Sequence, residues 1–293
     1  MSKTAQQIKN AAKLKKRIRT VIHNGLLAVI SFFWLIPIFW LIASAFNTDR
    51  GVNIRQFFPT TWTLDNFYQL FFQTDSVANF PRWFLNTLTV AVFACIISSL
   101  FVLMVSYTMS RLRFNMRKPL MNVGIILGLF PGVLSMIAIY FILKSLGLTD
   151  SLLALIIVYS ASSGLGYLVA KGFFDTIPKS LDEAARIDGA TQWDVFWRII
   201  IPLSRPIIVY TVLLAFLAPW VDFVFANIIM TSRDTNKFTV AIGLYNMLDR
   251  NLVNNYFSLF TAGAVVVSIP ISVLFIFMQN VYVEGVTGGS VKG

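Results

Sequence analysis

The residue types that usually carry chemistry are scarce in this sequence. It has one histidine, His23, and one cysteine, Cys95, which lies inside an apolar run. One cysteine excludes an intrachain disulfide and a cysteine metal cluster, and one histidine argues against histidine zinc sites and serine–histidine catalysis. We therefore expect no catalytic residue, no metal site and no cofactor.

Asp222 is the one acidic residue within the long apolar segments, and Trp220 lies two positions before it. A carboxylate accepts hydrogen bonds from sugar hydroxyls, and an aromatic ring can stack on the face of a sugar. A charge at membrane depth is costly when unpaired, so such residues usually face a cavity or a partner. The sequence leaves two interpretations open for Asp222, a sugar pathway shared with Trp220 or a structural hydrogen bond to a neighbouring helix.

The composition is that of a polytopic membrane protein. Of the 293 residues, 57% are hydrophobic and only 13% are charged, about half the charged fraction of a soluble domain. These proportions exclude a soluble globule, a disordered chain, a collagen and a coiled coil.

Six apolar segments are long enough to cross a hydrocarbon core of roughly 30 Å, which takes about 20 helical residues. They cover residues 25–46, 83–110, 119–143, 151–170, 206–232 and about 259–281. The expected fold class is therefore all-α, with six transmembrane helices. Pro37 and Pro131 lie inside the first and third segments, where we expect each to kink a continuous helix.

The positive charges orient these spans. Seven Lys and Arg residues lie within residues 3–19, which contain no acidic residue. Most of the 24 Lys and Arg fall on one side if the N-terminus is inside, so we predict that both termini are cytoplasmic. Residues 1–24 then form a basic tail beside anionic lipid rather than a nucleic-acid site. Residues 25–282 form the membrane domain, and residues 283–293 form a Gly-rich tail.

The informative polar stretch is the loop at 171–205, which is predicted to hold two short helices joined by a turn. Ser180 and Glu183 have the spacing of a capping box at the start of the first helix. Gly189 supplies the left-handed residue that ends it. Thr191 is placed to cap the second helix, which has a strongly apolar face.

The string EAARIDGA at 183–190, followed by IIIP at 199–202, resembles the E-A-A-x3-G-x9-I-x-L-P loop of ABC-importer permeases. Ile201 stands where the family more often has leucine. WTLDNF at 62–67 and FLNTL at 84–88 look like carbohydrate permeases, and the Gly-rich ending is similar to that of the maltose/maltodextrin branch. The resemblance assigns contact with an ATPase to Glu183, Ala184, Ala185, Asp188, Gly189 and Ala190.

This resemblance implies the ABC type I importer permease fold and a transmembrane subunit of an ATP-driven sugar importer in a bacterial cell membrane. The chain has no G-x-x-x-x-G-K-[ST] phosphate loop, so ATP would be hydrolysed by a separate cytoplasmic ATPase dimer. That dimer would bind the helix at 181–190. The other implied partners are a second permease subunit, which completes a heterodimer, and an extracytoplasmic sugar-binding protein. The implied cargo is a maltodextrin-type oligosaccharide.

Other functions compete with this interpretation. A permease of the same family for another oligosaccharide, of the raffinose or multiple-sugar type, would have the same motifs. An ion-coupled secondary transporter would be expected to carry several buried acidic residues, and the apolar segments hold one. A membrane enzyme would need a paired acid and base or a metal cluster. The tail at 286–293 is either a frayed end or a peptide docked along the ATPase dimer.

Overall fold

We describe the protein from a computed structural model of the whole chain. The ranges that can be described are 3–48, 51–52, 57–75, 77–161, 166–232 and 234–288, with side chains from 13 to 279 within them. In these ranges the chain is nearly all helical, and the one β-pairing is an isolated bridge between Asn47 and Trp62. The all-α expectation is confirmed.

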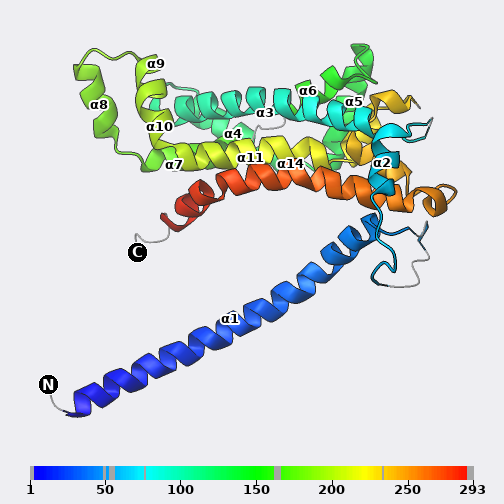
Figure 1. The fold of residues 1–293 in the computed structure, drawn as a ribbon. Coiled ribbons are helices and arrows are strands. Elements are labelled where there is room, and N and C mark those ends of the chain that lie inside the picture. Colours follow the sequence, from blue (N-terminus) through cyan, green and yellow to red (C-terminus); the bar gives the residue numbers. More distant parts are fainter. Residues whose placement is uncertain are drawn as a thin grey trace.

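Three long helices form the frame of the molecule: α1 (Lys3–Ala45), α3 (Phe80–Arg111) and α14 (Val253–Gly288). Each contains a segment long and apolar enough to cross a membrane. The helix α3 is central and packs against α6, α7 and α11, whereas α1 leaves the bundle and contacts α14 near its own C-terminal end (Figure 1). Both predicted domain boundaries, after residues 24 and 282, fall inside continuous helices.

Three bent pairs of helices bring the number of candidate spans to as many as six in the described chain. The first pair is α4 (Arg117–Gly128) with α5 (Gly132–Ser145), at 100°. The second is α6 (Leu152–Ala161) with α7 (Gly166–Thr176), at 42°, and its joining residues lie outside the described ranges. In the third, the helical run Gln192–Leu203 meets α11 (Arg205–Val221) at 85°. The third and fourth predicted spans are therefore not single straight helices, whereas the 85° bend lies at Ser204, just before the fifth predicted span begins.

Pro131 breaks the third predicted span, which corrects our expectation of a simple kink. Its ring disfavours a helical conformation at Phe130, the residue before it. The helix α4 ends at Gly128, and Pro131 has an extended ψ of 120° and precedes the first residue of α5. The Pro131 carbonyl then accepts the N–H groups of Leu134 and Ser135 in the new helix.

The fifth predicted span is interrupted at Asp222. The helix α11 ends at Val221, Asp222 is extended with a ψ of 102°, and α12 (Val224–Ile229) follows. The Asp222 carboxylate accepts the Phe225 N–H at 3.0 Å. An aspartate that bonds to nearby backbone competes with helix continuation, so the break has a local cause.

The short elements gather at the two ends of the bundle (Figure 1). At one end lie α2 (Asp65–Phe72), the 3₁₀ turn η3 (Thr235–Lys237) and α13 (Val240–Asn246). The main core cluster lies here, with Phe80, Trp83, Ile242 and Met247 fully buried. At the other end lies α8 (Lys179–Ile187). The start of α1 and the end of α14 lie toward the α8 end.

Candidate functional site

The loop at 171–205 folds as two helical pieces joined by a tight turn. Gly189 has a φ of +86°, in the left-handed region where a side chain is strained. After it, Thr191 and Asp194 form a reciprocal capping box, with Thr191 Oγ1 accepting the Asp194 N–H at 3.2 Å. Both local predictions are confirmed. The second piece contains α9 (Gln192–Asp194), a π-helical turn η2 (Val195–Ile200) and α10 (Ile201–Leu203).

The predicted capping box of α8 is wrong. The residue before the helix is Pro178, and no side chain caps the first turn. Pro178 fixes its own φ near the value required and has no N–H to satisfy, so the helix begins two residues earlier than the motif indicated. Ser180 therefore lies within the first turn. The acidic residue in that turn is Asp182, which is buried.

Asp182 faces Arg111, the last residue of α3. Arg111 Nε lies 3.4 Å from Asp182 Oδ2, and the two side chains are 1% and 6% exposed. Arg111 Nη2 also donates to the carbonyl oxygens of Phe174 and Ile177, each at 2.9 Å. Because these carbonyls lie at the end of α7 and just beyond it, one guanidinium joins α3, α7 and α8.

Two further hydrogen bonds connect the same end of α3 to the loop. The Tyr107 hydroxyl lies 2.9 Å from Gln192 Oε1, which also accepts from Arg186 Nη2 at 3.1 Å. Ser110 Oγ donates to Asp175 Oδ1 at 2.6 Å. Sequence reasoning missed all of these residues. The one usable signal in the sequence is a basic residue, Arg111, directly after the predicted span 83–110, where the charge pattern treats it only as one of the 24 Lys and Arg.

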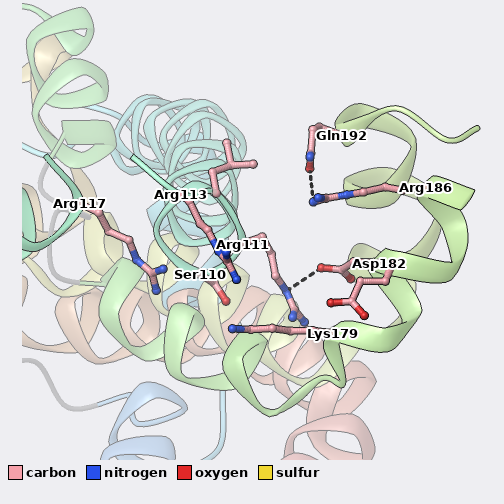
Figure 2. A pocket seen from close by; sticks show the side chains of 10 residues that line it. Ser110, Arg111, Arg113, Arg117, Lys179, Asp182, Arg186 and Gln192 are labelled. Carbon is pink, nitrogen blue, oxygen red and sulfur yellow. Dashed lines mark hydrogen bonds and ion pairs between the residues drawn. The ribbon is translucent and has the colours of Figure 1, made fainter. Parts of the chain in front are cut away.

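A cleft of about 370 Å³ opens between α8 and the residues that link α3 to α4 (Figure 2). Its charged lining residues are five basic ones, Arg111, Arg113, Arg117, Lys179 and Arg186, and two acidic ones, Asp182 and Glu183. In the part of the chain that the structure describes, no group of three or more His, Cys, Asp or Glu residues could hold a metal ion. With five basic and two acidic residues in its lining, the cleft is strongly positive.

The residues that the loop motif singled out lie on α8 and its turn. Glu183, Ala184, Asp188 and Gly189 are exposed, whereas Ala185 and Ala190 are half-buried. The Ala190 N–H donates to the Ala185 carbonyl at 2.9 Å, which closes the turn. The apolar side chain of Ile187 is 86% exposed beside them. The exposed side of α8 and its turn thus presents two acidic side chains, Glu183 and Asp188, together with small and apolar groups, without cover from the rest of the described chain.

Trp220 and Asp222 lie at the C-terminal end of α11, whose first residue, Arg205, adjoins the loop that contains α8. Trp220 is 3% exposed and packs edge-on against Phe84, with ring centroids 5.2 Å apart. Its Nε1 has no hydrogen-bond partner among the described residues. Asp222 is half-buried, and its Oδ2 accepts the Tyr159 hydroxyl at 3.0 Å. The carboxylate thus forms a bond to a neighbouring helix, and the Trp220 ring is enclosed in this conformation.

Comparisons with known proteins agree with this architecture. Residues 103–287 match the family described as "Binding-protein-dependent transport system inner membrane component". The chain is 31% identical to the galactooligosaccharides transport system permease protein GanQ of Bacillus subtilis over 282 residues, which cover 96% of this chain and 98% of that one. It is also 31% identical to the maltodextrin transport system permease protein MdxG of Bacillus subtilis, covering 97% and 99%.

A solved structure resembles the chain over nearly its whole length. It is a bacterial ABC transporter involved in the import of the acidic polysaccharide alginate. The TM-score is 0.76 at 20% identity, and the match covers 91% of this chain and 97% of the other. The likeness shows that the two chains share a fold.

Proposed function

Because the chain belongs to the family of binding-protein-dependent transport system inner membrane components, we propose that it is the transmembrane subunit of an oligosaccharide importer. It is a carbohydrate-type ABC permease, and relatives that match nearly its full length are named permeases for galactooligosaccharides and maltodextrins. The proposed cargo is an oligosaccharide of this kind, with a maltodextrin as the first choice. The chain would form half of the pathway, and a second permease subunit would form the other half.

The proposed point of coupling is α8. A separate ATPase dimer would bind the exposed side of this helix through Glu183 and Ala184, while the half-buried Ala185 packs toward the bundle and the turn at Asp188–Ala190 holds the helix in place. The exposure of this side supports the assignment, because an apolar residue such as Ile187 at 86% exposure favours contact with a partner.

The observation that carries this proposal is the buried Arg111–Asp182 pair. A force applied to α8 reaches α3 through this ion pair at 3.4 Å and reaches α7 through the two carbonyls that Arg111 binds. Gln192 adds a second link through Tyr107. Movement of α8 by the ATPase would therefore move two candidate spans together, which is what a change in the direction of access requires.

We also propose the membrane orientation. The α8 end, the start of α1 and the end of α14 would face the cytoplasm, in agreement with the excess of Lys and Arg on that side. The opposite end would receive sugar from an extracytoplasmic binding protein. Reporter fusions after Arg113 and Ile187 should read as cytoplasmic and fusions near Asp65 and Asn236 as external. One reversed reporter would contradict this topology.

Trp220 and Asp222 keep a proposed role in the sugar pathway. The support is that Trp220 Nε1 is a buried donor with no partner in the described chain, two residues from a half-buried carboxylate. Opening of the bundle would expose both groups to a sugar. Asp222→Asn should raise the sugar concentration needed for half-maximal uptake, while Tyr159→Phe should not if its bond is only structural. Equal effects from both changes would favour a structural role for Asp222.

Two measurements test the function itself. Uptake of labelled malto- and galacto-oligosaccharides, in cells with and without the chain, identifies the cargo.

For coupling, Ile187→Asp should abolish copurification of the ATPase. The matched control is Leu146→Asp, because Leu146 is 64% exposed and directly follows α5, which lies at the opposite end of the bundle (Figure 1). Retention of the ATPase by Ile187→Asp would remove α8 as its docking site.

A further inference from the structure

We propose that the cleft beside α8 binds the phosphate group of an acidic phospholipid from the cytoplasmic leaflet. The proposal rests on the cytoplasmic placement of α8. It adds to the coupling role a lipid contact that no motif in the sequence indicates.

The charge balance of the cleft is the first support. Asp182 is already paired with Arg111 at 3.4 Å. Among the other charged lining residues, Glu183 is then the only acid facing four basic side chains. Arg186 donates to the neutral Gln192 amide oxygen. The cleft has a surplus of positive charge that a ligand with negative charge would neutralise.

Close ion pairs do not take up this surplus, although Arg117 also interacts electrostatically with the Asp175 carboxylate. Arg113, Arg117 and Lys179 form no ion pair within the described chain, whereas Lys171 and Arg198 are each paired with an acidic residue four positions away. At the inner edge of the cleft, Arg111 Nη1 is buried without a hydrogen-bond partner among described residues. Guanidinium groups match phosphate oxygens in geometry and charge.

The position of the cleft indicates a lipid as the source of that phosphate. Arg117 is the first residue of α4, an apolar helix in which no residue is buried by the chain. Leu120 and Val123 are 45% and 51% exposed along it. Acyl chains can therefore lie against α4 while the headgroup reaches the basic residues. Basic pockets between helices on the cytoplasmic side are typical sites for acidic lipid headgroups.

The bound phosphate would lie between Lys179 on α8 and Arg113 and Arg117 beside α3 and α4 (Figure 2). It would therefore add an ionic contact between the coupling helix and the spans, parallel to the Arg111–Asp182 pair. Loss of the lipid would loosen α8 without removing its ATPase-binding side.

The test uses the full chain, purified in detergent with the subunits that it retains, and titrated with phosphatidylglycerol. The cleft variant carries Arg113→Gln, Arg117→Gln and Lys179→Gln. The matched control carries Arg82→Gln, Lys237→Gln and Arg250→Gln, which removes the same charge from exposed side chains outside both the cleft and the basic tail. Bound lipid is measured by native mass spectrometry. Since one basic residue near an acidic lipid contributes a factor of roughly five, we expect the cleft variant to bind at least about tenfold more weakly.

Further arms identify the ligand. Phosphatidylcholine should not replace phosphatidylglycerol, and millimolar inorganic phosphate should not displace it if acyl contacts contribute. Displacement by phosphate alone would overturn the lipid assignment in favour of a free anion. Equal lipid binding by the cleft variant and the control variant would overturn the site. If lipid binds wild type only when the ATPase has been stripped away, the cleft holds acidic side chains of the ATPase instead. Copurification of the ATPase with the cleft variant separates failure here from failure of the coupling proposal.

Discussion

The two ends of α3 are held by different chemistry. At the end near Phe80, neutral groups bind the backbone of the η3–α13 segment. Trp83 Nε1 donates to the Thr235 carbonyl at 2.8 Å, and Asn86 Nδ2 donates to the carbonyls of Asn236 and Phe238 at 2.8 and 2.9 Å. Trp83 and Phe238 also belong to the main core cluster. That end is fixed by shape as well as by hydrogen bonds.

At the other end, the decisive contact is the ion pair of Arg111 and Asp182. A buried ion pair adds little net stability when intact, because desolvation offsets the attraction, but breaking it leaves an isolated buried charge. The neutral end has no such asymmetry. The contrast indicates that the Phe80 end holds α3 in place. The Arg111 end moves as one unit with α8, because separating the two would leave an unpaired buried charge, which is unfavourable in free energy.

The largest effect is expected from breaking the ion pair. Arg111→Ala leaves Asp182 buried and unpaired, and we expect a loss of about 3–5 kcal/mol in the free energy of unfolding. Denaturant unfolding of the purified chain measures it. Arg198→Ala is the control, because its pair with Asp194 is 3.4 Å long but the Arg198 side chain is 81% exposed, so the loss should be below about 1 kcal/mol. Equal losses would remove the distinction between the two ends.

The next effect concerns shape at the neutral end. A Cβ atom at Gly243 would lie 2.1 Å from Trp83 Cε3, so Gly243→Ala forces the indole out of its place. Overpacking of this kind costs about 1–3 kcal/mol. Gly172→Ala has open space around it and should cost nothing measurable. If Gly243→Ala unfolds like wild type, packing does not fix that end.

A smaller effect on stability, with a large one on transport, is expected at the turn after α8. Gly189→Val places a β-branched residue at a φ of +86°, which costs about 1–3 kcal/mol locally. The turn should shift and uptake should fall while membrane insertion is normal. Gly189→Asn is the matched variant, because asparagine tolerates the left-handed region. Normal uptake and ATPase stimulation in Gly189→Val would contradict the coupling role of the turn.

The smallest effect concerns pH at the loops opposite α8. Burial raises the pKa of Asp150, but hydrogen bonds from the Ser232 N–H and the Thr231 hydroxyl outweigh it, so the pKa lies below its ordinary value of 3.8. The contact is therefore fully stabilising above about pH 4 and is lost as the pH falls through the folded-state value. Hydrogen exchange at the Ser232 amide should accelerate there. Asp150→Asn should remove that pH dependence, and an unchanged profile would exclude this contact as its source.

Local features were predictable from the sequence. Gly189 and the Thr191–Asp194 box depend on residues within four positions of one another, so local spacing was enough to predict them. The same spacing at Ser180 and Glu183 was not enough, because Pro178 makes α8 begin two residues earlier. The six apolar stretches were also recognisable, because a run of about 20 apolar residues indicates a segment that lies in lipid. The sequence did not predict which spans are straight helices. Whether Pro131 kinks the helix or breaks it depends on how the neighbouring helices pack against that segment.

The contacts that hold α8 were beyond sequence reasoning for a physical reason. Arg111 and Asp182 are 71 positions apart, and neither residue type at its position distinguishes a surface charge from a buried pair. The same limit applies to Trp220, because the apolar sequence around it fits both a ring packed in the core and a ring that lines a cavity. Packing of α3 against α7 and α11 decides both cases. Residues 289–293 of the Gly-rich tail lie outside the described chain, and the proposal that the tail docks on the ATPase stays a prediction.

The length of α3 has a consequence for the bilayer that surrounds it. Its 32 residues extend about 48 Å at 1.5 Å per residue, whereas the hydrocarbon core is roughly 30 Å thick. Both anchored ends therefore project beyond the acyl chains into the hydrated interface. A thinner or thicker membrane can then be accommodated by a change in helix tilt, at a cost of fractions of a kcal/mol per Å. Transport should consequently tolerate lipids of different chain length without strain on either anchor.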